Sequence, residues 1–399
     1  MSDTDSRKQA TSGRTRRELL RRAGAASAAL AVGVSARAQP DRGNDCDAVV
    51  DASGGGDFET LQRAVASASP GETLCLEPGT YGGPVEVDVP DLRVRARRPH
   101  SSLVTGSTDR TGAAVSVTAD GVTLSGLAVS HPEGLLGVAV ASGRDRVTVR
   151  DTAVRDVGPV GRLGAAGIRC GGGHEDLTLV GNRVDGVANA VDERSGYPTA
   201  NGVVVAGDGE LSRATVANNV IRAVRSDVAA VGLLLGVDAT GVAVRNNVVR
   251  GLSATPENDP DGTDDAVSLE RTFAQGIAVG GATERVALRR NVVADVTASY
   301  YAGTGLRVDG SAAGLTATHN DLLAPVGVHN AGDAALEATC NYWGDPDGPR
   351  PVMSEQPIRD SQGRTAVVGP VEYDPWLVRS FRGSTDRRTA CRGTDRDRQ

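Results

Sequence analysis

The chain has 399 residues, of which 39% are hydrophobic and 3% aromatic, and its formal net charge at pH 7 is −7. The acidic balance argues against a nucleic acid as partner, because a phosphate backbone attracts basic surfaces. The length suits one long domain with a single core, and five cysteines are too few for a disulfide scaffold.

Residues 1–38 have the pattern of an export signal. Arg16-Arg17 precedes an apolar run of small residues, 23–36, and Ala36-Arg37-Ala38 offers a small-x-small cleavage site. The pattern resembles a twin-arginine signal; a basic cytoplasmic helix is the alternative. The apolar run is too short for a confident membrane anchor, and no second stretch of spanning length follows. We expect a secreted or cell-surface protein without a membrane span after signal removal.

The mature chain is more acidic than the whole. Residues 1–38 hold eight basic and three acidic residues, so their removal changes the net charge from −7 to −12. The single lysine, Lys8, leaves with them. A linker, residues 39–46, is expected to lead into the fold.

A short helix is expected near the start of the mature chain. The sequence SGGGDFETLQRAV predicts a glycine turn, Asp57 as N-cap and a helix with an apolar face. That face consists of Leu61, Ala64, Val65 and Ala68. Because a stack of repeats has open ends, we expect this helix to cover the first coil.

Two motifs then recur together seven times. The first is Gly-apolar-x-apolar, with its glycines at 137, 167, 202, 232, 276, 305 and 327. The second ends in Asn followed by an apolar pair, 14 to 17 residues after each glycine. The pieces alternate with period two and are therefore strands, and three strands with three turns in roughly 29 residues fit one coil of a right-handed parallel β-helix. The fold class is all-β, with three strands per coil and about nine or ten coils.

The asparagines of the second motif fall at one register. They are Asn182, Asn219, Asn247, Asn291, Asn320 and Asn341. In stacked coils, an Asn at an internal turn tolerates a left-handed backbone and bonds the amide of its neighbour. We therefore predict a structural Asn ladder; Leu127 and Thr152 hold the same register earlier, so the ladder begins late.

The coils are expected to span residues 47–346. Residues 347–380 are expected to form a C-terminal cap in which Tyr373 and Trp376 plug the last coil, and 381–399 reads as a disordered Arg/Asp-rich tail. Cysteines at the two ends could pair, Cys46 with Cys75 and Cys340 with Cys391, as an exported protein allows.

Two segments resemble known β-helix proteins. SGGGDFETLQRAV followed by PGTY is similar to the N-terminal cap of the pectin-lyase-like superfamily, and CNYWGDPDGP resembles the closing motif of NosD-like, or CASH-type, repeat proteins. The resemblance covers roughly residues 47–346. The resemblance implies a surface that binds or acts on polysaccharide. Its motifs indicate the fold far better than they indicate a reaction.

Insertions mark one corner of the coil. From the second motif to the next repeat glycine the gaps range from 7 to 29 residues, and the longer links are 188–201, 253–275 and 297–304. Loops from one corner of a solenoid line one face, which is often the binding face.

The three links carry aromatic and charged residues suited to a sugar. Candidate binding residues are Asp192, Glu193, Arg194, Tyr197, Phe273, Tyr300 and Tyr301. Aromatic rings stack on the C–H faces of sugars, and charged groups bond hydroxyls. Alternatively, the links fold onto the outward apolar pair Val204 and Leu234, and the aromatics bury that patch.

The longest link also holds candidate catalytic and metal-binding groups. Asp264, Asp265, Glu270 and Arg271 could act as acid and base if they converge in a cleft. Asp259, Asp261, Asp265 and Glu270 come near calcium-loop spacing, but Asp264 stands where glycine is required. A solvated acidic loop is the alternative; calcium is therefore an optional ligand, and no cofactor is required.

Two functions follow from this pattern. One is an exported, monomeric β-helix protein that binds polysaccharide or a cell-surface glycan at or near the cell surface, without catalysis. The other is a polysaccharide lyase or glycoside hydrolase with its site at the insert corner. Convergence of two or more carboxylates, or of a carboxylate and an arginine, would favour the enzyme.

Overall fold

A computed structural model describes residues 46–106, 112–158, 164–190, 198–255, 272–352, 364–381 and 391. These residues belong to one compact unit, residues 44–399. The predicted signal (1–38) and nearly all of the linker (39–46) lie outside the described residues. No helix in the described part of the chain has the length and apolar character needed to cross a bilayer.

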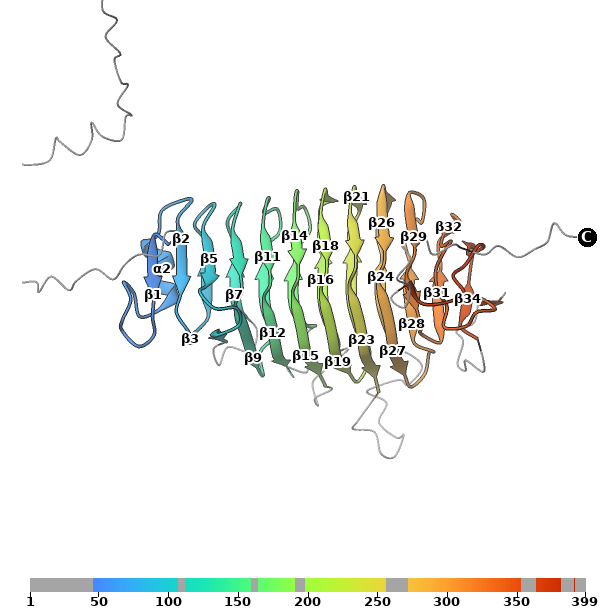
Figure 1. Cartoon of the computed structure of the whole chain (residues 1–399), viewed down its shortest axis with the longest axis horizontal. Helices are drawn as coiled ribbons and strands as arrows, with labels where there is room; N and C mark the ends of the chain where they lie inside the picture. Colours follow the sequence, from blue (N-terminus) through green and yellow to red (C-terminus); the bar gives the residue numbers. More distant parts are fainter. Residues whose placement is uncertain are drawn as a thin grey trace, which may run out of the picture. The chain divides into compact units, whose positions relative to one another are not determined.

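The described residues form a parallel β-helix, with a strand in each of three long sheets for most coils (Figure 1). Sheet A runs in the order β1 (Ala48–Val50), β2 (Thr73–Leu76), β5 (Arg93–Ala96), β8 (Thr123–Ser125), β11 (Thr148–Arg150), β14 (Thr178–Val180), β18 (Thr215–Ala217), β22 (Ala243–Arg245), β26 (Val286–Arg289), β29 (Leu315–Thr318), β32 (Leu336–Glu337) and β35 (Val371–Glu372).

Sheet B follows sheet A within each coil. It runs in the order β3 (Gly79–Gly82), β6 (Ser102–Thr105), β9 (Ala128–Pro132), β12 (Ala153–Gly158), β15 (Arg183–Asn189), β19 (Val220–Ser226), β23 (Val248–Ala254), β27 (Val292–Ala298) and β30 (Asp321–Leu322).

Sheet C completes the coil and carries the repeat glycines. It runs in the order β4 (Val85–Val87), β7 (Ala113–Val117), β10 (Leu136–Val140), β13 (Ala165–Cys170), β16 (Thr199–Ala206), β20 (Ala229–Gly236), β24 (Phe273–Val279), β28 (Thr304–Val308), β31 (Val326–Asn330), β34 (Ala366–Val368) and β33 (Arg350–Val352). A short sheet D joins β17 (Leu211–Ser212), β21 (Ala239–Thr240) and β25 (Thr283–Glu284).

The predicted all-β coil is confirmed by the pairing of successive coils. In one register Val216 pairs with Val244, in a second Ile221 pairs with Val249, and the strands are parallel in both. Sheets A, B and C hold 12, 9 and 11 strands, so sheets A and C slightly exceed the expected nine or ten coils. They do so because segments at the two ends add strands.

The repeat glycines sit where two coils and two sheets meet. A Cβ on Gly232 would lie 2.2 Å from Val249 Cγ1 in sheet B and 2.6 Å from the carbonyl oxygen of Gly276 in the next coil. Gly202 and Gly276 are enclosed in the same way. Glycine recurs at this register because a side chain would separate sheet C from the β-branched residues of sheet B.

The predicted asparagines form a continuous hydrogen-bonded ladder. The Oδ1 atom of Asn247 accepts from the backbone N–H of Asn219 at 3.0 Å, and Asn291 Oδ1 accepts from Asn247 in the same way. Equivalent bonds join the remaining rungs Asn182, Asn320 and Asn341 to their neighbours. All six side chains are buried.

The left-handed residue of the turn is not the ladder Asn, as the sequence had suggested. It is the residue just before it, with φ of 57° at Asn218 and at Asn246 and 56° at Arg290. This residue makes the sharp bend, so the next side chain turns inward beneath the neighbouring coil.

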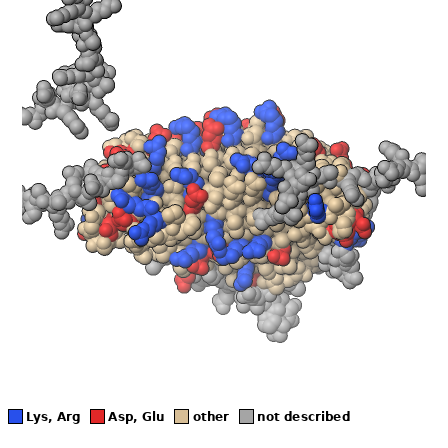
Figure 2. Space-filling model, in the orientation of Figure 1, with Lys and Arg blue, Asp and Glu red and all other residues tan. Residues whose placement is uncertain are grey.

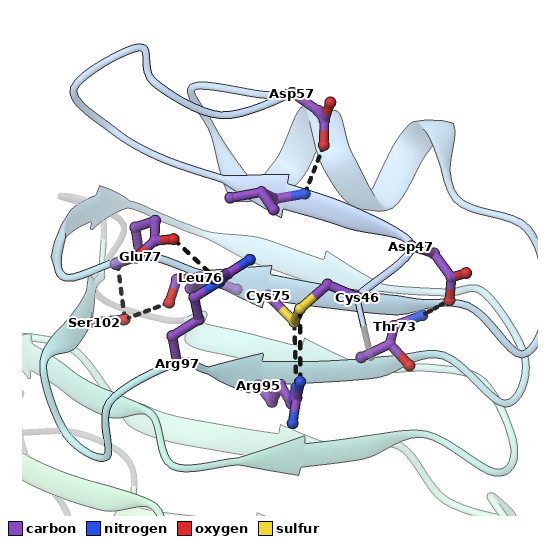
Figure 3. The surroundings of a disulfide bond; sticks show 11 residues. Cys46, Asp47, Asp57, Thr73, Cys75, Leu76, Glu77, Arg95, Arg97 and Ser102 are labelled. Atoms are coloured by element: carbon purple, nitrogen blue, oxygen red, sulfur yellow. Dashed lines mark hydrogen bonds and ion pairs between the residues drawn. A yellow bond between two sulfur atoms is a disulfide. The ribbon is translucent and has the colours of Figure 1, made fainter. Parts of the chain in front are cut away.

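Helix α2 (Leu61–Ser67) covers the first coil, and its Leu61, Ala64 and Val65 are buried. The prediction of Asp57 as N-cap is wrong: Thr60 caps the helix, and Asp57 instead accepts from the backbone N–H of Val49 at 2.9 Å. The helix begins later because Asp57 is held by strand β1 (Figure 3).

Disulfides join the cysteines at both ends. Cys46 bonds Cys75 beside the guanidinium of Arg95 (Figure 3), and Cys340 bonds Cys391. Parallel pairing continues past residue 346, since β34 and β35 extend sheets C and A. Trp343 is fully buried, and Tyr373 and Trp376 pack against the core as partly buried side chains.

Candidate functional site

The insert corner is one edge along the stacked coils. The residues at which sheet B ends pair in register from coil to coil: Asn189, Ser226, Ala254 and Ala298. Sheet C begins again at a second common register, Thr199, Ala229 and Phe273. The links between these registers therefore leave and re-enter the fold at the same corner.

Most of the predicted site residues lie outside the described residues. These are the binding candidates Asp192, Glu193, Arg194 and Tyr197, the catalytic candidates Asp264, Asp265, Glu270 and Arg271, and the calcium candidates Asp259 and Asp261, together with Asp265 and Glu270. Their convergence is untested, and so is the calcium loop.

Of the other three candidates, the structure brings the rings of Tyr300 and Tyr301 together and ties their backbones to the residue before Phe273. Thr272, next to Phe273, accepts from the backbone N–H of Tyr300 through its Oγ1 (2.9 Å) and from that of Tyr301 through its carbonyl (3.3 Å). The rings of Tyr300 and Tyr301 meet edge to face, with centroids 4.7 Å apart. All three aromatic side chains are half-buried, so each keeps surface open to solvent.

The outward face of sheet C adjoins this aromatic corner. One outward register runs through Arg169, Val204, Leu234, Ala278, Arg307 and His329. Val204 of the outward pair has an exposed fraction of 2%, and Leu234 is half-buried. This burial agrees with the alternative in which the pair is covered.

Arg307, His329 and Asp309 form a polar cluster at the end of this register. Arg307 donates from Nε to Asp309 Oδ1 at 2.6 Å, and its Nη1 lies 2.6 Å from His329 Nδ1. Because a guanidinium only donates, Nδ1 accepts and the ring proton resides on Nε2. Burial, and then the charge of Arg307, lowers the pKa of His329 to about 4.

Sequence reasoning missed this cluster. None of the three residues is among the site candidates of the sequence analysis. Their contacts join side chains 2 and 22 residues apart. An Arg-x-Asp at the end of a sheet C strand, with His at the same register one coil later, is the signal that could have revealed it.

Sheet B carries a second outward register of charged residues. Arg155, Asp185, Arg222 and Arg250 pair in register across four coils. Arg222 donates from Nε to Asp185 at 2.7 Å, and this bond, opposed by burial and assisted by Arg183, lowers the pKa of Asp185. Figure 2 shows arginine and acidic side chains interspersed over the visible face, as expected of a solvated surface with many ion pairs.

Comparisons with known proteins identify no family. No family model and no curated protein matches the chain. Similar solved structures include an alginate lyase from Paenibacillus sp. str. FPU-7, with 16% identity and TM-score 0.43, covering 78% of this chain and 95% of its own. Pectate lyase Pel9A has 14% identity and TM-score 0.44, covering 83% and 76%.

A PL6 alginate lyase bound to a trisaccharide is also similar, with 13% identity and TM-score 0.30, covering 78% of this chain and 90% of its own. At these identities and TM-scores, none of the three indicates what this chain binds. The assignment of the fold therefore stands on its own strand pairing.

Proposed function

We propose that this protein is exported and binds polysaccharide at or near the cell surface, along the insert corner and the adjoining outward face of sheet C. The observation that carries the proposal is the edge-to-face pair of Tyr300 and Tyr301, whose backbone N–H groups bond Thr272, the residue before Phe273 in the neighbouring coil. The pattern of residues 1–38 supports export.

The aromatic cluster has the chemistry of a sugar platform. A half-buried tyrosine presents an apolar ring to the C–H face of a pyranose and a hydroxyl to its polar edge. The backbones of Tyr300 and Tyr301 are held by hydrogen bonds to Thr272, so little backbone freedom is lost on binding.

Polar groups follow the aromatics along sheet C. Gln275 on β24 pairs in register with Thr304 on β28, and Arg307 lies further along β28. Half-buried amide and guanidinium groups beside aromatic rings fix the orientation of a polyhydroxylated ligand. A chain of sugars lying along these strands would meet the rings first and these donors next.

The proposal is tested by retention of the mature protein in gels cast with different soluble polysaccharides. Replacing both Tyr300 and Tyr301 with alanine should weaken retention about 10-fold or more, because each aromatic contact contributes roughly 1 kcal/mol. The matched control is Tyr342→Ala, which should bind like the wild type. Tyr342 is a half-buried tyrosine next to the ladder residue Asn341.

The same assay separates the proposed function from its rivals. Retention that is equal for the wild type and the double variant would contradict the aromatic platform, and no retention in any polysaccharide would contradict binding altogether. Because we propose that calcium is optional, retention should persist in a chelator. New chain ends in the polymer would instead identify an enzyme.

A further inference from the structure

The corner that carries the Asn ladder ends in two potential metal ligands. His319 and Cys340 occupy the left-handed position just before Asn320 and Asn341, with φ of 58° and 56°. The backbone N–H of His319 donates to the carbonyl of Cys340 at 3.0 Å. The two side chains therefore leave the same corner one coil apart.

A third potential ligand reaches the same point from the C-terminal segment. Cys391 is bonded to Cys340, with their Cα atoms 5.3 Å apart. One ligand atom from each of His319, Cys340 and Cys391 lies within 4.8 Å of the other two. Among the described residues, this is the group of three His, Cys, Asp or Glu side chains close enough to hold a metal ion.

The imidazole of His319 has an unexplained polar atom. Its Nδ1 is buried and has no hydrogen-bond partner. A buried polar atom without a partner costs about 1–3 kcal/mol, so native proteins rarely keep one without a purpose. A nitrogen of the same ring lies within 4.8 Å of the sulfur atoms of Cys340 and Cys391.

We propose that reduction of the Cys340–Cys391 disulfide converts this corner into a zinc site, with His319 Nδ1 and the two thiolates as ligands and water in the fourth position. Tetrahedral zinc with bonds of about 2.0 Å to nitrogen and 2.3 Å to sulfur places its ligands roughly 3.3–3.8 Å apart. To reach these distances, the two sulfur atoms must separate once the disulfide is broken. The imidazole nitrogen, now within 4.8 Å of both sulfurs, must approach them.

The conversion balances without any further reactant. A dithiol reductant gives two electrons and two protons to the S–S bond, which breaks into two thiols while the reductant becomes a disulfide. Zn²⁺ then displaces the two thiol protons as the thiolates bind. The sulfur atoms of Cys340 and Cys391 cannot bond to each other and bind zinc as thiolates at the same time. Zinc binding and the disulfide therefore exclude one another.

The site would therefore follow the redox state of its surroundings. Reducing compartments keep thiols free, whereas outside the cell the disulfide forms. In either state Cys391 stays tied to the corner that carries the Asn ladder, since the metal and the disulfide each join Cys391 to Cys340.

Cobalt titration of the full chain tests the proposal. After reduction with a phosphine and without oxygen, Co²⁺ should bind at one equivalent, with sulfur-to-cobalt charge-transfer absorption and the visible bands of a tetrahedral ion. His319→Gln should weaken binding about 10-fold or more, since even residues outside the ligand set change metal affinity by that factor. Cys391→Ser should lose most of the charge-transfer absorption.

Matched variants keep the titration specific. His100→Gln, an exposed histidine, and Cys46→Ser, from the other disulfide, should bind cobalt like the reduced wild type. The oxidised chain should show no charge-transfer band. Equal binding by oxidised and reduced chains, or by His319→Gln and the wild type, would overturn the proposal.

A second measurement needs no variant. Zinc should slow alkylation of Cys340 and Cys391 in the reduced wild type at least about 10-fold, as read from the masses of their peptides, because a thiolate bound to zinc is a weaker nucleophile. Cys46 and Cys75 should react at unchanged rates. If zinc left Cys340 and Cys391 equally reactive, the site would not exist.

Discussion

At the scale of single residues, the neutral His329 on the outward face of sheet C makes the stability of the fold depend on pH. Its folded pKa, about 4, lies below the ordinary value of 6.5. Between these values the unfolded chain binds a proton that the folded chain excludes, so stability is fully present above pH 6.5 and falls as the pH drops towards 4.

We therefore expect acid to destabilise the wild type more than His329→Gln. Lowering the pH from 7 to 4.5 should cost the wild type about 1–3 kcal/mol more of its free energy of unfolding, because one unit of pKa shift corresponds to 1.36 kcal/mol. Urea unfolding midpoints at the two pH values provide the measurement. Parallel pH profiles for the two proteins would show that His329 titrates normally.

The His329 cluster also shows what residue-level reading of the sequence could not provide. The outward register of Arg307 and His329 followed from alternation in the strands. Their contact with each other and with Asp309 depends on side-chain rotamers across two coils. Likewise, alternation in the strand indicates that Val204 points outward, but its burial does not follow from that pattern.

At the scale of elements, the ladder is the polar interior of the turn between sheets A and B. Asn219 Oδ1 accepts from Asn182 N–H, and its Nδ2 donates to the carbonyl of Leu179 and to Asn247 Oδ1. Replacing it with alanine leaves several buried groups without partners.

We expect Asn219→Ala to lower the free energy of unfolding by about 3–5 kcal/mol, given about 1–3 kcal/mol for each unsatisfied buried group. The control is its neighbour: Asn218→Gly changes an exposed, left-handed residue at which glycine is comfortable. Thermal and urea unfolding compare the two variants. A loss of equal size in both would mean that the turn, and not the ladder, provides the stability.

The glycine register makes a matching prediction for packing between sheets. In Gly232→Ala the new methyl would overlap Val249 and the backbone of Gly276, and we expect a loss of about 3 kcal/mol. Gly82→Ala adds a methyl where no atom lies within 4 Å, so its midpoint of urea unfolding should hardly change. An unfolding midpoint for Gly232→Ala close to that of the wild type would show that the two sheets separate at little cost.

At the scale of the whole molecule, the sequence predicted the repeat well and its accessory parts less well. A fixed spacing of glycines and asparagines is readable because every coil repeats the same steric demand. The helix cap at Thr60 was misplaced because the role of Asp57 depends on a contact with β1, eight residues away. Cys46 with Cys75 and Cys340 with Cys391 were named as possible pairs, and both disulfides form.

The insert corner marks the limit of sequence reasoning here. The common registers at which sheet B ends and sheet C begins follow from the repeat, so the corner could be located. The contacts that the links make at this corner depend on their own sequences, and these sequences do not follow the repeat. Tyr300 and Tyr301 are tied to the residue before Phe273 because their backbone N–H groups bond Thr272, and this contact has no signature in the spacing.

The most direct test of the account is hydrogen–deuterium exchange of the mature protein with and without a retained polysaccharide. Binding along the insert corner should slow exchange in peptides covering 272–279 and 298–308, while the sheet A strands β14, β18 and β22 stay unchanged. Protection confined to sheet A, or none at saturating polysaccharide, would contradict the proposed binding face.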